Sequence, residues 1–386
     1  MKTTCHALAL AALMLLLTGC GGSSVDLPED VMTDEAYAVQ WVDFESIKPD
    51  EGVKMLGGLA DDMSDDQPKA RLWLSAEADQ IEGDYRERWE AFTDAGCQGV
   101  LTVYYRNEVT EGEGEDKKKV AKYRKHTFIK AGKKAKAKDL EEALDEFAED
   151  DGIDDLELEP VGKDTGWFWV TRGESPDGSP KMPKKGDEKT AEAFEKLLAK
   201  ADDAAIVVAW RMIDGISDEI DDELDREEIS DERKEELERA KATQSIVLAC
   251  SPGTSAQLSA RVTFEKSEHA KAYAQEHNDS ILDVRASLKK AMINAESPPH
   301  PKVIDGVADS MQIKTSGKTA TLELDRGAVK DMLTLMSARM GMGGDDTSPV
   351  GLLRVESLLQ VPDRSDVPGV RSCYDDLKLD RSRQPQ

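Results

Sequence analysis

The chain has 386 residues and a formal net charge of −28; 39% of its residues are hydrophobic and 34% are charged. The length allows two domains, and the apolar fraction excludes a chain that is disordered throughout. Because such a negative charge repels nucleic acid, we expect no nucleic-acid partner.

The first twenty residues, "MKTTCHALAL AALMLLLTGC", have a positive end at Lys2 and an apolar stretch from Ala7 to Leu17. A helix needs about 20 apolar residues to cross a bilayer, so this stretch is too short for a permanent span. Its length is typical of the hydrophobic region of a secretory signal peptide.

The end of this segment, Leu17-Thr18-Gly19-Cys20, resembles the lipobox of bacterial lipoproteins. The resemblance implies that residues 1–19 are a signal peptide and that Cys20 carries the lipid, with residues 20–33 as a flexible tether. Several acyl chains on one residue anchor a protein firmly, whereas one chain binds a membrane only marginally. We therefore expect an exported protein held by lipid in the bacterial cell envelope, in the periplasm or on the outer surface. The alternative is an ordinary signal peptide that ends in cysteine.

Between residues 34 and 202, β-rich stretches alternate with amphipathic helices. The pattern predicts a strand at about 36–44, followed by helices containing Met55, Leu56, Leu59, Trp89 and Phe92. A hairpin then joins "GVLTVYYRNEV" to "KYRKHTFIKA", and the helix "KDLEEALDEFAE" follows it. A second hairpin turns near Gly162, and the helix "TAEAFEKLLAKA" ends the unit.

Residues 203–342 repeat this order. The pattern predicts a strand, then a helix capped by Ser217 that continues or restarts at Ser230, and then a hairpin turning at Pro252-Gly253. A long helix follows, capped by Ser267 and ended by Pro298, Pro299 and Pro301. A hairpin turning at Ser316-Gly317 and a helix at about 327–341 complete the unit. The stripe of the long helix is Ala270, Tyr273, Ala274, His277, Ile281, Val284, Leu288 and Met292.

Two stretches at an offset of 169 residues, "DEAYAVQWVDFESI" and "DAAIVVAWRMIDGI", also resemble each other. The residues that coincide are Asp34/Asp203, Ala36/Ala205, Val39/Val208, Trp41/Trp210 and Ile47/Ile216. The predicted fold class is therefore α+β, with two tandem similar units at 34–202 and 203–342. Each would be an antiparallel sheet of about five strands covered on one face by amphipathic helices. The two sheets would lie side by side or join, and residues 343–386 would form a mostly irregular tail.

Three of the five cysteines, Cys97, Cys250 and Cys373, lie beyond the leader and the lipobox, so at most one internal disulfide is expected. A Cys97–Cys250 bridge is one possibility, and a buried thiol at the end of "SIVLAC" is the other expectation for Cys250.

No catalytic motif is present: the sequence lacks G-x-S-x-G, H-E-x-x-H and G-x-G-x-x-G, so any catalytic residues are unknown. The histidines lack metal-ligand spacing, and the acidic stretch 150–159 lacks the spacing of an EF-hand. We expect no metal and no cofactor. His277 lies on an apolar helix stripe and is expected in the core.

Charge is segregated between two neighbouring blocks. Residues 117–138 hold eleven Lys/Arg and no acid, and residues 139–159 hold twelve Asp/Glu and no base. The preferred interpretation is that the blocks neutralise each other across a hairpin and its following helix; the alternative is that the basic block faces anionic headgroups.

The densest aromatic stretch is "GWFWVTRG" at 166–173. In a strand, Trp167 and Trp169 point to one face and Phe168 to the other. We expect the two tryptophans to pack in the core or at the junction of the units, and keep them as candidate ligand or partner contacts.

Three functions are compatible with this sequence. The first is a non-enzymatic, lipid-anchored envelope protein that binds an envelope protein or glycan through its sheets or their junction. The second is an envelope hydrolase that uses carboxylates. The third is a structural or charge-presenting surface lipoprotein.

Overall fold

The computed structural model describes twelve stretches of the chain. They are residues 27–61, 68–111, 117–133, 135–149, 156–163, 165–172, 186–201, 204–226, 229–251, 257–292, 301–329 and 331–332. The predictions for the signal peptide, Cys20 and the tail at 343–386 concern residues outside these stretches, as do the turn at Pro252-Gly253 and the prolines Pro298 and Pro299.

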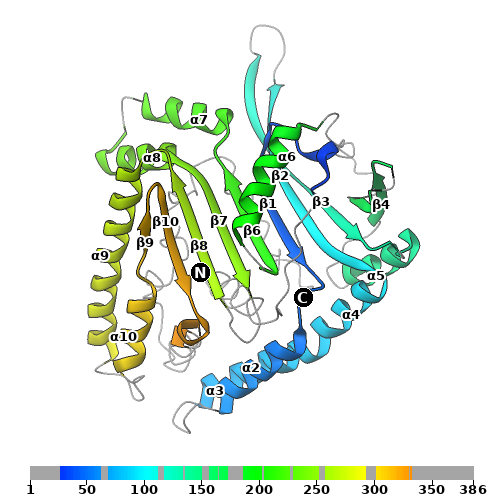
Figure 1. Cartoon of the computed structure of the whole chain (residues 1–386), viewed down its shortest axis with the longest axis horizontal. Coiled ribbons are helices and arrows are strands. Elements are labelled where there is room, and N and C mark those ends of the chain that lie inside the picture. Colours follow the sequence, from blue (N-terminus) through cyan, green and yellow to red (C-terminus); the bar gives the residue numbers. More distant parts are fainter. Residues whose placement is uncertain are drawn as a thin grey trace, which may run out of the picture.

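The structure is built on a single ten-stranded antiparallel sheet with the order β4-β5-β3-β2-β1-β6-β7-β8-β10-β9 (Figure 1). The strands are β1 (Ala36–Asp43), β2 (Cys97–Glu111), β3 (Lys118–Ala131), β4 (Leu156–Val161), β5 (Trp167–Arg172), β6 (Ile206–Arg211), β7 (Thr243–Ser251), β8 (Gln257–Phe264), β9 (Lys314–Ser316) and β10 (Thr319–Leu324). Helices and strands are therefore mixed, with every strand pair antiparallel.

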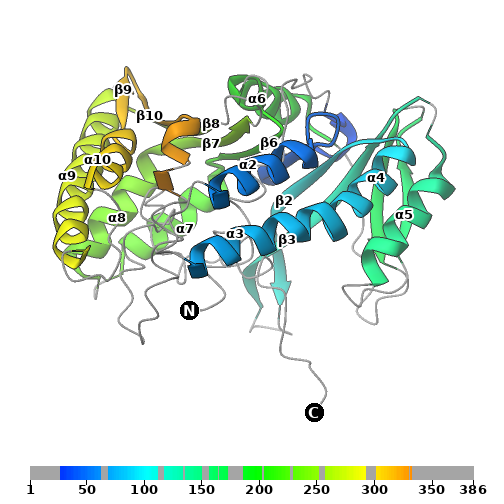
Figure 2. The ribbon, with the colours of Figure 1, turned by 90° about the horizontal axis from the view of Figure 1, so that it is seen from below.

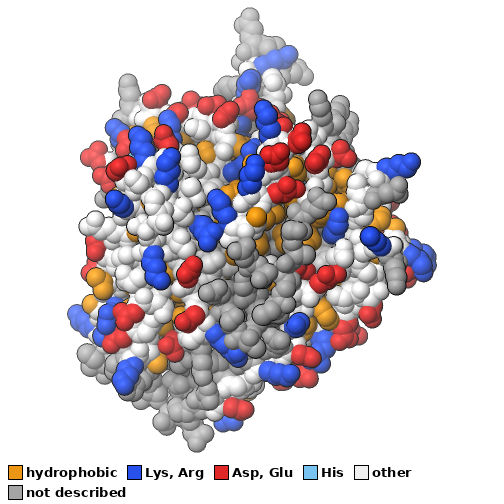
Figure 3. All heavy atoms as spheres, in the orientation of Figure 1, with side chains coloured by type: hydrophobic (Ala, Val, Ile, Leu, Met, Phe, Trp, Pro, Cys, Tyr) orange, Lys and Arg blue, Asp and Glu red, His pale blue; other side chains and the backbone are white. Residues whose placement is uncertain are grey.

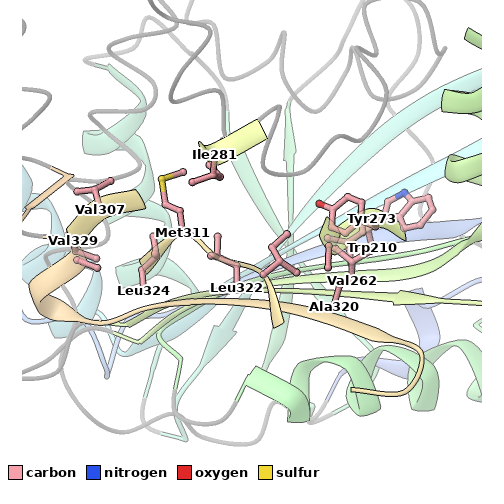
Figure 4. Close-up of a cluster of buried hydrophobic side chains, with 14 of the residues drawn as sticks. Trp210, Val262, Tyr273, Ile281, Val307, Met311, Ala320, Leu322, Leu324 and Val329 are labelled. Carbon is pink, nitrogen blue, oxygen red and sulfur yellow. The ribbon is translucent and has the colours of Figure 1, made fainter. Parts of the chain in front are cut away.

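Most of the described helices lie on one side of this sheet, which we call the helix-rich face (Figure 2). They are α2 (Pro49–Asp61), α3 (Pro68–Gln80), the π-helical turn η2 (Ile81–Tyr85), α4 (Arg86–Asp94), α5 (Ala137–Glu149), α7 (Asp214–Leu224), α8 (Asp231–Ala242), α9 (Ser267–Met292) and α10 (Pro301–Ser310). Figure 4 shows part of the core on this side, where Tyr273 and Ile281 of α9 meet Val262 and Leu322 of the sheet.

Helix α6 (Glu188–Leu198) lies on the opposite side, which we call the α6 face. Asp187 caps the helix because its carboxylate accepts a hydrogen bond from the Thr190 backbone N–H at 3.1 Å. Phe194 and its neighbours at helical spacing pack onto the sheet. Residues 27–33 cover the same face beside α6, with η1 at Glu29–Val31.

The prediction that helices cover only one face was therefore wrong. The pattern of α6 shows an apolar stripe, but a stripe does not specify which side of a sheet it meets. Trp41, Leu101 and Phe128 make the α6 face of the central strands as apolar as the helix-rich face, so both need a cover.

The predicted hairpins are confirmed. β2 pairs with β3, β4 with β5, β7 with β8, and β9 with β10. Gly162 and Gly317 have φ angles of 68° and 58°, a region in which glycine is favoured, and each lies at its predicted turn. A new helix, α8, starts after Ser230, one of the two alternatives that the sequence left open, and the Ser230 hydroxyl caps it by accepting from the Arg233 N–H.

Two helix predictions were wrong. Helix α7 begins at Asp214 with Ile213 at the N-cap, so Ser217 lies inside the helix and caps nothing. Pro301 starts α10, whereas the sequence suggested only that it ends α9; proline fits the first helical position because its missing N–H has no partner there.

The strands join in one sheet, with β1 and β6 at its centre. Counted outward from this pair, the first half runs β1-β2-β3-β5-β4 and the second β6-β7-β8-β10-β9. The residue correspondence suggested by the offset of 169 is wrong in detail. Trp41 lies on the α6 face and Trp210 on the helix-rich face, because an odd shift in register turns a side chain to the other face.

Candidate functional site

The candidate site is an apolar strip on the helix-rich face at the centre of the sheet. It consists of six side chains from four neighbouring strands, namely Val42, Ile206, Val208, Leu248, Leu258 and Ala260. They form two adjacent rows. In the first, Val208 pairs with Leu248 and Leu248 with Ala260. In the second, Val42 pairs with Ile206, and the buried Cys250 lies between Ile206 and Leu258. At about 4.8 Å per strand, the strip extends about 14 Å across the sheet.

All six side chains of the strip are partly exposed. The next row of the same face, which includes Trp210 and Val262, is buried beside α9. The helices thus cover these strands more fully around Trp210 and Val262 than where they carry the strip. An incompletely covered apolar surface on a rigid sheet is suited to bind an apolar partner.

Polar groups border the strip on the side of β2. Gln40 continues the row of Val208 onto β1, and the Tyr104 hydroxyl lies 3.5 Å from the Gln40 side-chain oxygen. On the next strand pair the Thr102 and Thr127 hydroxyls are 3.5 Å apart. An apolar floor with a few polar groups at one end is the usual composition of a binding surface.

An ion pair fastens the first half of the sheet to helix α7 of the second. Arg106 of β2 is 9% exposed, and its Nε donates to Glu219 Oε1 at 2.9 Å. The Tyr123 hydroxyl donates to Glu219 Oε2 at 2.7 Å. A Cβ at Gly215 would lie 2.2 Å from Arg106 Nη1, so the start of α7 touches the guanidinium. Burial by itself lowers the pKa of Arg106. The hydrogen bond and the charge of Glu219 outweigh this effect and raise the pKa above its usual value, so the guanidinium stays charged.

A second, partly buried arginine joins the halves on the α6 face. Arg211 of β6 donates from Nε to the Ala36 carbonyl at 3.1 Å and from Nη2 to the Asp34 carbonyl at 3.2 Å. Its guanidinium carbon lies 5.5 Å from the centre of the Phe194 ring. This side chain therefore holds β1, β6 and α6 in one arrangement.

Trp167 and Trp169 both lie on the α6 face, and Phe168 lies on the helix-rich face, as predicted. Their exposed fractions are 3% and 4%. Trp167 packs against Trp41 at a centroid distance of 6.0 Å, and Trp169 against His126 at 5.3 Å. Both indoles thus serve packing in this structure, and a ligand contact by either stays a prediction.

Cys97, Cys250 and His277 are buried in the described part of the chain. Cys97 and Cys250 are separate buried thiols, so the suggested bridge between them does not form, and burial raises the pKa of Cys97 to about 12. Cys250 is buried at the end of its strand, as expected. His277 is 5% exposed and stacks on Tyr273, which places it in the core, as expected.

Two ion pairs join the charge blocks at their boundary. Lys136 pairs with Asp139 at 3.6 Å and Lys138 with Glu142 at 2.6 Å, both on the exposed start of α5. The basic strand β3 continues away from α5 into a hairpin that extends beyond the sheet (Figure 1). There Lys119 pairs with Glu108 of β2 at 3.0 Å. Neutralisation between the blocks is therefore local.

Among the described residues, no three His, Cys, Asp or Glu side chains form a group that could hold a metal ion. None of the helices described is long and apolar enough to cross a bilayer. Comparisons with protein-family models, curated proteins and solved structures find no match for this chain.

Sequence reasoning did not find the apolar strip. Val42, Leu248 and Ala260 are far apart in the sequence, and each lies in a strand whose pattern already predicts burial. The strip exists because β1 pairs with β6, a contact between the halves that no local pattern encodes. The only available signal was the apolar character of consecutive positions in these strands.

Proposed function

We propose that this protein is a lipid-anchored protein of the bacterial cell envelope that binds an apolar segment of another envelope protein at the strip. The observation that carries the binding role is the partly exposed set of aliphatic side chains at the centre of a rigid sheet. The lipobox resemblance at Leu17–Cys20 supports the anchor and the location.

An amphipathic helix is the partner element that suits the strip best. A helix is about 10–12 Å wide with its side chains, comparable with the width of about 14 Å across four strands. Packing a helix on a sheet is also the arrangement that already buries the neighbouring rows of this face. The partner would supply apolar residues at i, i+3, i+4 and i+7.

Site-specific photo-crosslinking in cells tests the binding role. A photoreactive amino acid at Leu248 or Val208 should give a crosslinked product with a second protein, and the same residue at Thr321, on the opposite face, should not. Crosslinks from Leu248 that connect only to residues of the same chain would show that the chain covers its own strip and would contradict the proposal.

The anchor has a separate test. Cys20→Ala should leave a longer precursor that no longer incorporates labelled fatty acid, because the lipidated thiol and the cleavage site are lost together. Normal processing and continued membrane association of this variant would refute lipid anchoring without affecting the crosslinking result.

We also propose that residues 34–202 and 203–342 are two related units whose sheets are fused at the β1–β6 pair. The matching strand order of the halves supports this relation. An experimental structure in which the two five-strand sets superpose only after their order is permuted would argue against it.

A further inference from the structure

The α6 face of the outer second half presents a polar surface that is distinct from the strip. Its side chains come from alternate positions of β8, β10 and β9, which point away from the helix-rich core. We call this surface the hydroxyl face. Its exposed or partly exposed residues are Ser259, Arg261, Thr263, Lys314, Ser316, Thr319, Thr321 and Glu323.

The strand register aligns the hydroxyls in a straight row. Thr263 pairs with Thr319, and Thr319 with Ser316, so three accessible hydroxyl groups follow each other across three strands. Ser245, which pairs with Thr263 on the fourth strand, is buried and ends the row. Successive strands are about 4.8 Å apart, so the accessible part of the row extends about 10 Å. Each hydroxyl is both a donor and an acceptor, a capacity that matches the hydroxyls of a polyol.

The next row of the face carries two cations. Arg261 pairs with Thr321, and Thr321 with Lys314, so a hydroxyl stands between a guanidinium and an ammonium. Arg261 Nη1 donates to the Lys200 carbonyl at 2.9 Å, which fixes the position of the guanidinium at the edge of the covered region. Glu323 in the third row is the one acid of the hydroxyl face.

This local charge contrasts with that of the chain, whose formal net charge is −28. In Figure 3 the region over β8 and β10 is mainly white, from uncharged side chains and backbone, with both Lys/Arg and Asp/Glu spheres among them. An anionic ligand that the rest of the surface repels would be attracted here. None of the hydroxyl-face residues is aromatic, so the surface lacks the stacking platforms that single-stranded nucleic acids use.

We propose that the hydroxyl face binds a glycan that carries carboxylates. Sugar hydroxyls would exchange hydrogen bonds with the Ser/Thr row, and carboxylates would pair with Arg261 and Lys314. A flat face open at its β9 edge admits a long polymer rather than a single sugar, and binding there leaves the apolar strip on the other side of the sheet free for a protein.

Retention on polysaccharide beads tests this proposal. The protein used for the test starts at Gly21. It therefore includes all the residues that the structure describes, but not the leader or the lipidation site. It should be retained on alginate, which carries carboxylates, and should elute from neutral cellulose. Arg261→Gln with Lys314→Gln should weaken the apparent Kd for alginate about tenfold or more, the size expected for losing hydrogen bonds to charged groups.

A matched control changes the same residue types elsewhere. Arg226 and Lys234 are exposed near α7 and α8, so R226Q with K234Q alters the net charge equally and should leave retention unchanged. Thr263→Val with Thr319→Val removes two hydroxyls from the row without changing the charge, and should weaken the Kd severalfold, about threefold or more.

Three outcomes would overturn the proposal. Equal retention of the R261Q/K314Q variant and the control would show that the face is not the site. Equal binding to polyglutamate, an anion without sugar hydroxyls, would assign the surface to acidic proteins instead. Equal binding of the T263V/T319V variant and the parent chain would show that the hydroxyl row plays no part. Circular dichroism of each variant verifies that it is folded.

Discussion

The two halves of the sheet have the same strand order but opposite chemistry on the α6 face. In the first half this face carries Trp41, Phe128 and Trp169, and it is buried under α6 and residues 27–33. In the outer second half the corresponding positions carry Thr263, Thr321 and their polar neighbours. The backbone arrangement is thus compatible with either a covered or an open face, and the alternate side chains of each strand decide which one forms.

The largest expected effect comes from opening the covered half. Phe194 of α6 is fully buried in the cluster that includes Trp41 and Phe128, so Phe194→Ala should lower the free energy of unfolding by about 3–5 kcal/mol. Urea denaturation followed by circular dichroism measures the loss. Phe194→Leu, which keeps most of the volume, should cost less than about 1.5 kcal/mol. A negligible loss for Phe194→Ala would mean that α6 does not hold this face.

Burial of His126 makes the covered half sensitive to acid. Its ring lies between Tyr105 and Trp169, each at a centroid distance of 5.3 Å, and burial, with a contribution from Arg124, lowers its pKa to about 4. In the unfolded chain the pKa is about 6.5, so protons bind the unfolded state first as the pH falls. Stability is complete above about pH 6.5 and declines toward pH 4, by at most about 3 kcal/mol.

The measurement is the free energy of unfolding of the parent chain and of His126→Leu between pH 7 and pH 4.5. The variant should lose less stability over this interval, because it lacks the group whose protonation favours unfolding. Identical pH profiles for the two proteins would show that His126 is not buried in its neutral form.

A smaller effect is expected at the ion pair between the halves. Glu219→Ala removes the carboxylate 2.9 Å from the buried Arg106 and leaves it the longer ion pair with Glu108 at 3.6 Å, so it should cost about 2 kcal/mol. The neighbouring Asp218 is exposed, so Asp218→Ala serves as the control and should stay within about 0.5 kcal/mol. Equal effects of the two substitutions would mean that the pair does not fasten α7 to β2.

The smallest effect on stability is expected on the open face. Thr263→Val with Thr319→Val should change the free energy of unfolding by about 0.5 kcal/mol or less, because both side chains are partly exposed and valine also suits a strand. A loss comparable with that of Phe194→Ala would mean that this face is packed against something, and the distinction between the halves would fail.

The local elements could be predicted from the sequence, because their signals are local. The turn glycines Gly162 and Gly317 and the stripe of α9 lie within single hairpins or helices. The side chosen by α6 could not be predicted, since an apolar stripe carries no information on which face it meets. The helix α10 was missed because Pro301 both follows one helix and begins another.

The two candidate surfaces could not be predicted from local sequence patterns, for a related reason. The apolar strip needs the pairing of β1 with β6, and the hydroxyl row needs the register of three strands that span residues 257–324. The tryptophans Trp167 and Trp169, which the sequence singled out, are instead interior residues. The unusually aromatic stretch at 166–173 thus marks packed residues, whereas common residues such as valine and threonine form the exposed surfaces.

The central ladder has a consequence for the continuity of the chain. Five residue pairs join β1 to β6, and Arg211 and Glu219 add side-chain contacts across the same boundary. The covalent link between the halves is therefore not what keeps them together. Two separately made polypeptides, divided near residue 202, should find each other and complete one sheet, so this protein is suited to fragment complementation.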